Sequence, residues 1–448
     1  MVTLEFDDGD DGNNSFVMRE KLGDEEGSMN QPLPMKVIKD DDHLYPDGGK
    51  EAWVVVFGSF CAMFASFGIW NSMGVFQAWL VENSLQNYSE GTVSWIFSVY
   101  TFLFFLGGVQ VGPIFDKYGV RALVTAGTLG FGIALMMFSL SKEYYQFFLS
   151  YAILGGISCS LIFTPSVAVI GQWFDKRRGI ATGIATTGGS FGGIIFPLML
   201  RSLVPKIGFA WSVRIVGFFE LFFGLLSVFC LKSRIRGGAG SSAMIDLKAF
   251  LDVKFATLAV GNFMIELALQ IPPTYFITYA VSKGMERYFC YALIAIMNAS
   301  SVFGRFLPGY GADRFGVFNM VIVTLFLCAA FNLGIWVPIA HLDGRSMGGA
   351  IVYMVLFGFS SGSGISLTPV CFSKTCKIED YGKRYGTAYS LAAVASLIGI
   401  PIAGAILDRM DGNYAGLAAF CGASYLVGTI LFAISRGLYV GWSIKAIY

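Results

Sequence analysis

Among the charged residues that fall inside long apolar stretches, where an isolated charge is costly, two are candidates for a binding site. Arg305 lies in the apolar stretch 287–310, and Glu266 lies near the middle of the stretch 253–281. Charged side chains within membrane-spanning segments usually face a cavity, so both are candidates for a binding site. A guanidinium presents a fork of N–H donors that matches a carboxylate, and Glu266 is its expected partner. The alternative role for Arg305 is a structural salt bridge.

A second group of polar residues lies in a short turn that begins at Gly112 and reads GPIFDKYGVR. The chain reverses direction there within a few residues, and Gly119 permits a backbone conformation that other residues resist. Asp116 can accept hydrogen bonds from the N-terminus of a neighbouring helix, or it can pair with Arg121. A contact of this kind forms in one conformation and breaks in another, so we expect a conformational latch. The alternative is an ordinary charged turn.

The pattern of this turn returns in the second half of the chain. The segment from Gly309 to Gly316 reads GYGADRFG, and it places Asp313 and Arg314 where the first turn has an acidic and a basic residue. Two pairs of prolines also recur at an offset of 204 residues: Pro165 with Pro369, and Pro197 with Pro401. An internal repeat of this kind indicates two similar halves around a central site, which is the plan of a transporter.

Apolar stretches of membrane-crossing length must position these residues. The chain is 55% hydrophobic and only 14% charged, whereas soluble domains are ~25% charged. A soluble enzyme, a nucleic-acid binder and a disordered scaffold are therefore excluded as the main interpretation. Each stretch is near the ~20 residues that one crossing needs, and too uniformly apolar for a barrel strand. The twelve stretches are 52–80, 91–113, 120–141, 145–171, 179–204, 209–231, 253–281, 287–310, 316–340, 346–372, 386–407 and 413–435.

The predicted fold is an all-α integral membrane protein with twelve transmembrane helices in two pseudo-symmetric six-helix bundles. Residues 1–46 hold twelve acidic and four basic residues, and so polar a segment is expected to be disordered. The polar stretch from Lys232 to Asp252 separates the two halves. We therefore predict a disordered acidic cytoplasmic tail (1–49), bundles over 50–231 and 253–436, a cytoplasmic linker (232–252) and a C-terminal tail (437–448).

The distribution of Lys and Arg predicts the orientation. If both termini are cytoplasmic, the cytoplasmic loops and C-terminus hold seventeen Lys or Arg and the outer loops hold seven. This bias favours cytoplasmic termini. The plasma membrane is the expected location, with a vacuolar or other endomembrane as the alternative. The expected partners are the lipid bilayer and a small organic solute, for which an anion is one candidate; the net charge of +1 offers no field for nucleic acid. We expect a monomer without a cofactor or a metal.

Three motifs, in this order along the chain, resemble those of a known family. Residues 46–53 (PDGGKEAW) resemble the lead into helix 1 of monocarboxylate-porter relatives, in the spacing of fungal members. The turn from Gly112 resembles the signature between helices 2 and 3 of the major facilitator superfamily. Residues 172–183 (QWFDKRRGIATG) resemble the second monocarboxylate-porter signature, between helices 4 and 5. The motif residues are Asp47, Gly48, Gly49 and Trp53 in the first, and Lys176, Arg177 and Gly183 in the last.

The resemblance implies the major facilitator fold and transport by alternating access. It also implies that Arg305 binds a substrate carboxylate. Two positions depart from the proton-coupled animal members, which have a lysine at the position of Asn71 and an aspartate at that of Ser301. Proton coupling therefore stays open. Asn71 and Ser301 are expected to hydrogen-bond a solute, with Tyr275 and Asn298 lining the same cavity; for these last two, ordinary packing is the alternative.

The sequence therefore predicts a secondary active or facilitative transporter of a small organic solute. Candidate solutes are a monocarboxylate, a riboflavin-like vitamin and a secondary metabolite. Glu220 and Arg214, in the stretch 209–231, are expected to be structural. A nutrient sensor built on a transporter scaffold is the alternative function. An enzyme is not expected, because the apolar stretches contain no histidine to pair with a nucleophile.

Overall fold

The computed structural model describes residues 2–7, 15–20, 46–234, 246–342, 346–376 and 378–442. These residues belong to two units, Met1–Leu44 and Tyr45–Tyr448. In the first unit, strand β1 (Val2–Asp7) pairs antiparallel with β2 (Ser15–Glu20). The β1 sequence VTLEFD alternates apolar and polar residues, as a strand does. The disorder expected over 1–49 stays a prediction. Residues 21–45 lie outside the described part.

The first half of the second unit contains six crossings of membrane length. The first crossing begins with α1 and continues through α2 and a π-helical turn, η2. Crossings two and three are merged in α3, crossing four runs from α4 to η4, and crossings five and six are merged in α6. The bounds are α1 (Lys50–Trp70), α2 (Met73–Trp79), η2 (Leu80–Ser84), α3 (Glu90–Leu140), α4 (Tyr144–Phe147), η3 (Phe148–Gly155), α5 (Gly156–Ala168), η4 (Val169–Gln172) and α6 (Arg178–Cys230).

The second half repeats this plan after a short 3-10 helix, η5. Crossing seven is broken between α7 and α8, at a Pro-Pro pair, and crossing nine passes through a π-helical turn, η6. The remaining crossings are single helices. The bounds are η5 (Leu247–Leu251), α7 (Val253–Leu269), α8 (Ile271–Ser282), α9 (Arg287–Phe315), α10 (Val317–Phe331), η6 (Asn332–Trp336), α11 (Val337–His341), α12 (Met347–Lys374), α13 (Ile378–Arg409) and α14 (Tyr414–Val440).

The predicted twelve crossings are confirmed. Eleven helices of the described part are long and apolar enough to span a membrane, by length and composition. The longest of them, α6, contains Gly208 at φ 78° and ψ 165°, so it is two helices joined at a kink. Each part of α6 is long enough for one crossing at ~20 residues. Gly119, at φ 76°, divides α3 in the same way.

The turns show the symmetry of the two halves. Gly119 lies between crossings two and three, and Gly316, at φ 90°, lies between crossings eight and nine. Gly208 lies between crossings five and six, and Gly412, at φ 80°, lies between crossings eleven and twelve. Glycine reaches positive φ at no steric cost, so each half reverses direction with the same residue type at the same place.

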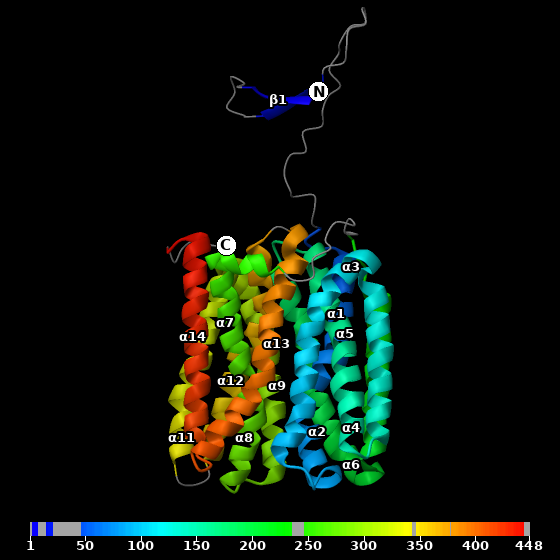
Figure 1. Cartoon of the computed structure of the whole chain (residues 1–448), viewed down its shortest axis with the longest axis vertical. Coiled ribbons are helices and arrows are strands. Elements are labelled where there is room, and N and C mark those ends of the chain that lie inside the picture. The colour runs from blue at the N-terminus through cyan, green and yellow to red at the C-terminus, as the bar shows by residue number, and fades with distance from the viewer. Residues whose placement is uncertain are drawn as a thin grey trace, which may run out of the picture. The chain divides into compact units, whose positions relative to one another are not determined.

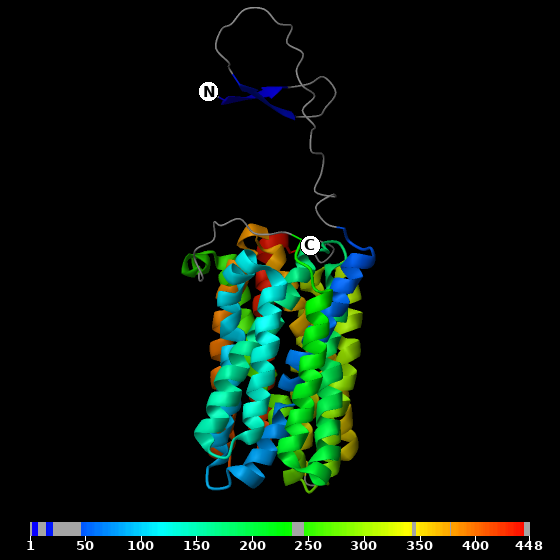
Figure 2. The same ribbon diagram turned by 90° about the vertical axis from the view of Figure 1, so that its right-hand side faces the viewer.

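Each half has its own aromatic core. In the first half the rings of Tyr100 and Tyr151, both fully buried, stack with centroids 4.7 Å apart. In the second half the ring of Phe276 stacks on that of Tyr353 at 4.8 Å. Figure 1 shows the two halves side by side, the first in blue to green and the second in green to red. The view in Figure 2, turned by 90°, has the first half in front.

The chain begins α1 and ends α14 at the same end of the bundle (Figure 1). We call this end the termini face, and the other end the opposite face. An even number of crossings requires this arrangement.

Within the first half, α1 and α6 pack with almost no side chain between them. A methyl group on Gly192 would lie 2.5 Å from the Cα atom of Gly68, and one on Gly68 would lie 2.7 Å from the Cα atom of Gly192. Small residues let membrane helices approach this closely, which maximises van der Waals contact. The expected packing role of the glycines in the fifth crossing is therefore present at this contact.

We predict that Gly192→Val lowers the stability of the folded protein. The valine side chain cannot fit between the two backbones, and overpacking of this kind costs on the order of 1–3 kcal/mol. The matched control is Gly334→Val, because nothing lies within 4 Å of a methyl group at that position. The measurement is thermal unfolding of both purified variants in detergent. A Gly192→Val protein that unfolds at the temperature of the control would contradict this account of the packing.

Candidate functional site

The two halves meet along two seams, one between α3 and α13 and one between α6 and α9, and the second holds the predicted site residues of α9. Glycines bring the two backbones together there: a methyl group on Gly183 would lie 2.5 Å from the carbonyl oxygen of Arg305, and one on Gly309 would lie 2.7 Å from that of Gly179. The family-motif residue Gly183 thus has a packing role at this contact. The backbone of Arg305 is thereby fixed against the opposite half.

Polar side chains bridge the seam farther from the termini face. The hydroxyl groups of Ser190 and Ser301 lie 2.6 Å apart, and both residues are buried. The Nδ2 atom of Asn298 donates to the carbonyl oxygen of Gly193 at 3.3 Å. The seam residues of α9 recur every three or four positions, so one face of that helix meets α6 over successive turns. Ser301 and Asn298, both predicted site residues, lie on this face.

At the termini face, Asp313 closes the seam. Its Oδ1 atom accepts from the backbone N–H of Gly179 at 2.8 Å, and its Oδ2 atom accepts from that of Ile180 at 2.9 Å. These N–H groups belong to the first turn of α6, where they have no partner within their own helix. A carboxylate at a helix N-terminus is favoured by hydrogen bonding and by the helix dipole. Asp313 therefore caps a helix of the other half.

A second contact between the halves lies beside this cap. The Nζ atom of Lys374, at the end of α12, is 2.9 Å from the Oδ1 atom of Asp175, in the turn before α6. The ion pair is partly exposed, so its strength depends on ionic strength. Together with the Asp313 cap, it joins the two halves at the termini face.

The other predicted latch residues make contacts within one half. Arg121 donates from Nε to the carbonyl oxygen of Leu231 at 2.7 Å, just after the end of α6. The guanidinium of Arg314 lies over the ring of Tyr310 on its own helix, 4.6 Å from the centroid. Gly119 forms the kink in α3. The side chain of Asp116 and the surroundings of Gly112 lie outside the described part. The second copy of the turn, through Asp313, thus supplies the observed contact between the halves.

Four of the predicted substrate-binding residues surround one small recess of about 30 Å³ between the two halves. These residues are Asn71, Asn298, Ser301 and Arg305. The recess is also lined by Trp70 and Gln270, which the sequence did not single out. Gln270 ends α7 immediately before Ile271-Pro272-Pro273, and a polar residue at a proline-interrupted break in a membrane helix is the signal that could have found it.

The recess presents N–H donors that have no acceptor. Within the described part, the Nε1 atom of Trp70, the Nε2 atom of Gln270 and the Nε atom of Arg305 are buried without a hydrogen-bond partner. All three residues are at most 6% exposed. A buried donor without an acceptor is destabilising, and native structures rarely contain one. Three of them around one recess indicate a site for a group that accepts hydrogen bonds.

Arg305 is held in place by its remaining contacts. Its guanidinium donates to the carbonyl oxygen of Thr186 across the seam and lies over the ring of Phe67, 5.1 Å from the centroid. No ion pair of Arg305 occurs among the described residues, so the alternative of a structural salt bridge is not seen there. Asn71 donates to the carbonyl oxygen of Gly189 at 3.0 Å.

Glu266 and Tyr275 are placed differently from the residues around the recess. Glu266 is 5% exposed, its Oε2 atom has no partner in the described part, and it is not paired with Arg305 as the sequence suggested. Glu266 is one helical turn from Gln270 on α7, so the two share a face. Tyr275 donates to the carbonyl oxygen of Ile400 at 3.2 Å and lines a larger cavity nearer the opposite face.

This larger cavity, which we call the vestibule, has a volume of about 530 Å³. It follows the recess along the same helices, since Gly74 and Gln77 come just after Trp70, and Thr274 just after Gln270. Tyr275 and Tyr414 supply aromatic surface to it. Its charged lining residues are two exposed acids, Glu82 and Asp408, from different halves. The protein is thus closed at the termini face and hollowed toward the opposite face.

Arg214 and Glu220, the charged residues expected to be structural, do not line this recess. The Nε atom of Arg214 donates to the hydroxyl of Ser139 at 3.0 Å, and its guanidinium stacks over Trp211. Glu220 is fully buried, and neither of its carboxyl oxygens has a partner in the described part.

Helices of membrane-crossing length around a buried polar recess, closed at one end and hollow at the other, define a membrane transporter. The chain belongs to the Major Facilitator Superfamily, whose family model matches residues 56–386.

Fungal transporters are similar over most of their length. An MFS-type transporter of Gibberella moniliformis is 38% identical over 397 residues, which cover 88% of this chain and 92% of that protein. The riboflavin transporter MCH5 of Saccharomyces cerevisiae is 36% identical over 422 residues, 89% of this chain and 80% of that protein. The fujikurins efflux protein of Gibberella fujikuroi is 38% identical over 413 residues, 90% of this chain and 86% of that protein.

Solved structures share the fold. The human organic anion transporter MFSD10 superposes with a TM-score of 0.64 and 16% identity, covering 86% of this chain and all of that one. The Escherichia coli transporter FucP in the outward conformation gives a TM-score of 0.63 and 18% identity, covering 86% of this chain and 99% of that one. The predicted major facilitator fold is therefore confirmed.

We predict that Asp313→Ala opens the termini face. The substitution removes the cap on α6, and loss of such a cap costs about 1 kcal/mol, or roughly a fivefold change in an equilibrium. The reporter is a Ser190→Cys substitution in the buried seam, labelled with N-ethylmaleimide. We expect its labelling to become roughly fivefold faster.

The control is Arg314→Ala, which removes an exposed side chain on the neighbouring position of α9. The same proteins with Ser190 intact measure the labelling of native cysteines. If Asp313→Ala labels at the rate of the Arg314→Ala control, the cap does not hold the termini face closed.

Proposed function

We propose that this chain carries a small organic solute across the membrane by alternating access, with the solute bound at the recess around Arg305. The two halves rock about this site, so that the seam between α6 and α9 closes one face while the vestibule opens the other. The observation that carries the proposal is the group of three buried N–H donors without acceptors, from Trp70, Gln270 and Arg305. The described residues contain no ion pair that neutralises Arg305 in their place.

The two cavities differ in size, and from this we infer a solute with a small head group and a larger body. The recess, at about 30 Å³, holds little more than a carboxylate or carbonyl group. The vestibule, at about 530 Å³, is within the usual range for small-molecule sites. We infer that an acceptor group enters the recess while the rest of the solute packs in the vestibule against Tyr275 and Tyr414. Asn71, Ser301 and Asn298 border the head group.

Glu266 is retained as a polar residue of the site, one turn behind Gln270 on the same face of α7. When the halves move, the carboxyl group of Glu266 can hydrogen-bond a bound head group or pair with the guanidinium of Arg305. The family-motif residues Lys176 and Arg177 lie at the termini face, in the turn before α6, and contribute basic charge there.

The orientation of the protein follows from charge. The excess of Lys and Arg in the loops of the termini face, seventeen against seven, supports a cytoplasmic position for that face. In this orientation the vestibule faces the outside or the organelle lumen. The plasma membrane is the proposed location, with a vacuolar or other endomembrane as the alternative. The proposed parts are a cytoplasmic tail over 1–49, bundles over 50–231 and 253–436, a linker over 232–252 and a C-terminal tail over 437–448, in a functional monomer.

The names of similar proteins indicate the range of solutes. One is a riboflavin transporter and another is a fujikurins efflux protein. A riboflavin-like vitamin and an exported secondary metabolite both offer carbonyl acceptors and a body large enough for the vestibule. A monocarboxylate, expected from the resemblance to monocarboxylate porters, would place its carboxylate on Arg305.

A nutrient sensor on the same scaffold is the alternative function. Purified protein in liposomes separates the two functions, because a sensor binds the solute without moving it. Net movement of solute across the liposome membrane supports the transporter, and binding without movement supports the sensor. An enzyme is not proposed, since the similar curated proteins are named as transporters.

We predict that Arg305→Ala abolishes solute uptake while the protein still reaches the cell surface. The experiment is an uptake screen in a transport-deficient fungal strain, with riboflavin, monocarboxylates and fungal secondary metabolites as solutes. The loss of a hydrogen bond to a charged donor costs roughly 1.5–3 kcal/mol, so a reduction of at least tenfold is expected.

The matched control is Arg214→Ala, which removes an arginine that binds Ser139 away from the recess. Arg305→Lys tests geometry, since it keeps the charge and loses the fork of donors. Unchanged uptake by Arg305→Ala, at equal surface amount, would remove Arg305 from the site.

We predict that uptake does not depend on a proton gradient. Proton-coupled relatives have ionisable groups at the positions of Asn71 and Ser301. In this chain both side chains make neutral hydrogen bonds. Asn71 binds the carbonyl oxygen of Gly189, and Ser301 binds the hydroxyl of Ser190. The measurement is uptake with and without an uncoupler, in cells whose solute gradient is clamped. Loss of uptake on adding the uncoupler would contradict the prediction and direct attention to Glu266.

A further inference from the structure

One turn, from Trp173 to Ile180, carries two polar contacts that join the halves at the termini face. Its Asp175 carboxylate pairs with Lys374, and its last N–H groups bind Asp313. Both contacts need the turn to keep one shape, because the carboxylate and the N–H groups must point at partners on two different helices. The residues that fix this shape therefore decide whether the termini face closes.

The segment that leads into α1 holds this turn through Asp47. The Oδ1 atom of Asp47 accepts from the backbone N–H of Asp175 at 2.7 Å and from that of Arg177 at 3.4 Å. The backbone N–H of Asp47 donates to the carbonyl oxygen of Trp173 at 3.1 Å. Asp47 thus binds the turn at Trp173, Asp175 and Arg177. More than 120 positions separate Asp47 from the turn in the sequence.

The conformation of Asp47 shows that these bonds select a rare backbone shape. Asp47 has φ 46°, in the left-handed region that non-glycine residues seldom adopt. Gly48 and Gly49 follow, and Gly49, at φ 88°, begins α1 without a side-chain cap. Such strain persists only where the surroundings impose it. Trp53, one turn into α1, adds an edge-to-face contact with Phe174 at 5.3 Å.

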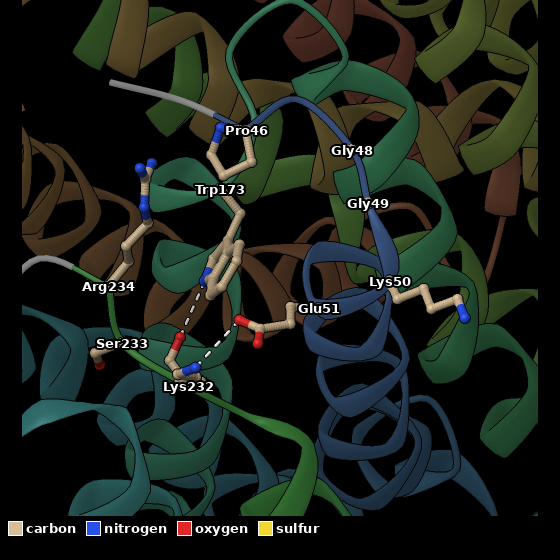
Figure 3. Close-up of a pocket in the computed structure, with 9 residues that line it drawn as sticks. All are labelled: Pro46, Gly48, Gly49, Lys50, Glu51, Trp173, Lys232, Ser233 and Arg234. Atoms are coloured by element: carbon tan, nitrogen blue, oxygen red, sulfur yellow. Dashed lines mark hydrogen bonds and ion pairs between the residues drawn. The ribbon is translucent and has the colours of Figure 1, made fainter. Parts of the chain in front are cut away.

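The turn is also fastened to other parts of the first half. Figure 3 shows the Trp173 indole donating to the carbonyl oxygen of Lys232 (3.0 Å) and the Lys232 ammonium pairing with Glu51 of α1 (3.1 Å). Pro46, Gly48 and Gly49 lie around the same indole. The lead-in segment, the turn and the end of α6 therefore form one connected unit within the first half.

We propose that Asp47 is a positioning residue of the gate, and that the lead-in segment 46–53 is part of the closing machinery. Asp47 holds the turn in the shape that presents N–H groups to Asp313 and a carboxylate to Lys374. It makes neither contact itself. Without Asp47, Asp313 and Lys374 remain across the seam. The N–H groups and the Asp175 carboxylate that they bind are then no longer held toward them.

The test compares two substitutions of Asp47 in the Ser190→Cys reporter described above. Asp47→Ala removes the acceptor, so we expect N-ethylmaleimide labelling to become roughly fivefold faster, as for loss of one cap. Asp47→Asn keeps an acceptor oxygen and tolerates positive φ, so labelling stays near the wild-type rate. Combining Asp47→Ala with Asp313→Ala accelerates labelling by less than the product of the two separate effects, because both substitutions disrupt the contact of Asp313 with α6.

Two controls separate gating from general damage. Asp411→Ala alters the other non-glycine residue with positive φ, at the turn before α14, and should leave labelling unchanged. Thermal unfolding of each variant measures stability independently of closure. The proposal is overturned if Asp47→Ala labels like wild type, if Asp47→Asn labels as fast as Asp47→Ala, or if the effects of Asp47 and Asp313 are fully additive. The assay needs no solute, so its outcome is independent of whether transport is found.

Discussion

The close approach of the α6 and α9 backbones is the constraint on which the rest of the structure depends. At Gly183 and Gly309 no side chain separates the two backbones, and this close approach fixes where the polar groups of one helix meet the other. Asp313 is thereby brought onto the first turn of α6, and Arg305 onto the carbonyl oxygen of Thr186. A seam made of glycine contacts and small polar side chains, without large interlocking ones, is also one that can part. The same small residues therefore permit both tight closure and separation.

The contacts that close the termini face are individually weak. A helix cap contributes about 1 kcal/mol, and a partly exposed ion pair such as Lys374 with Asp175 contributes about 0–1 kcal/mol. A gate of this strength biases the protein toward the closed face without locking it. A solute that binds the other conformation a few kcal/mol more tightly is then enough to reverse the bias. In the observed conformation, an acceptor bound at the recess satisfies the unpartnered donors and so stabilises the state in which the termini face is closed.

The sequence predicts the fold well because membrane length, apolar content and internal repeats are recorded in it directly. It also places Arg305 with Asn71, Ser301 and Asn298, whose types are unusual in apolar helices. It does not show contacts between helices that are distant in the chain. Only the structure supplies the donors of Trp70 and Gln270 and the separation of Glu266 from Arg305. It also supplies the contact of Arg121 with Leu231 after α6, the cap on α6 by Asp313, and the hairpin of β1 and β2.

The central claim is that the two faces open in turn around one site. Spin labels at Tyr118 and Leu251, exposed on different halves at the termini face, and at Asn83 and Ser282, exposed at the opposite face, measure both openings in one protein. Pulsed electron paramagnetic resonance then gives the two distances with and without a transported solute. The account predicts that the first distance lengthens as the second shortens. Distances that change in the same direction, or a change at one face alone, would contradict it.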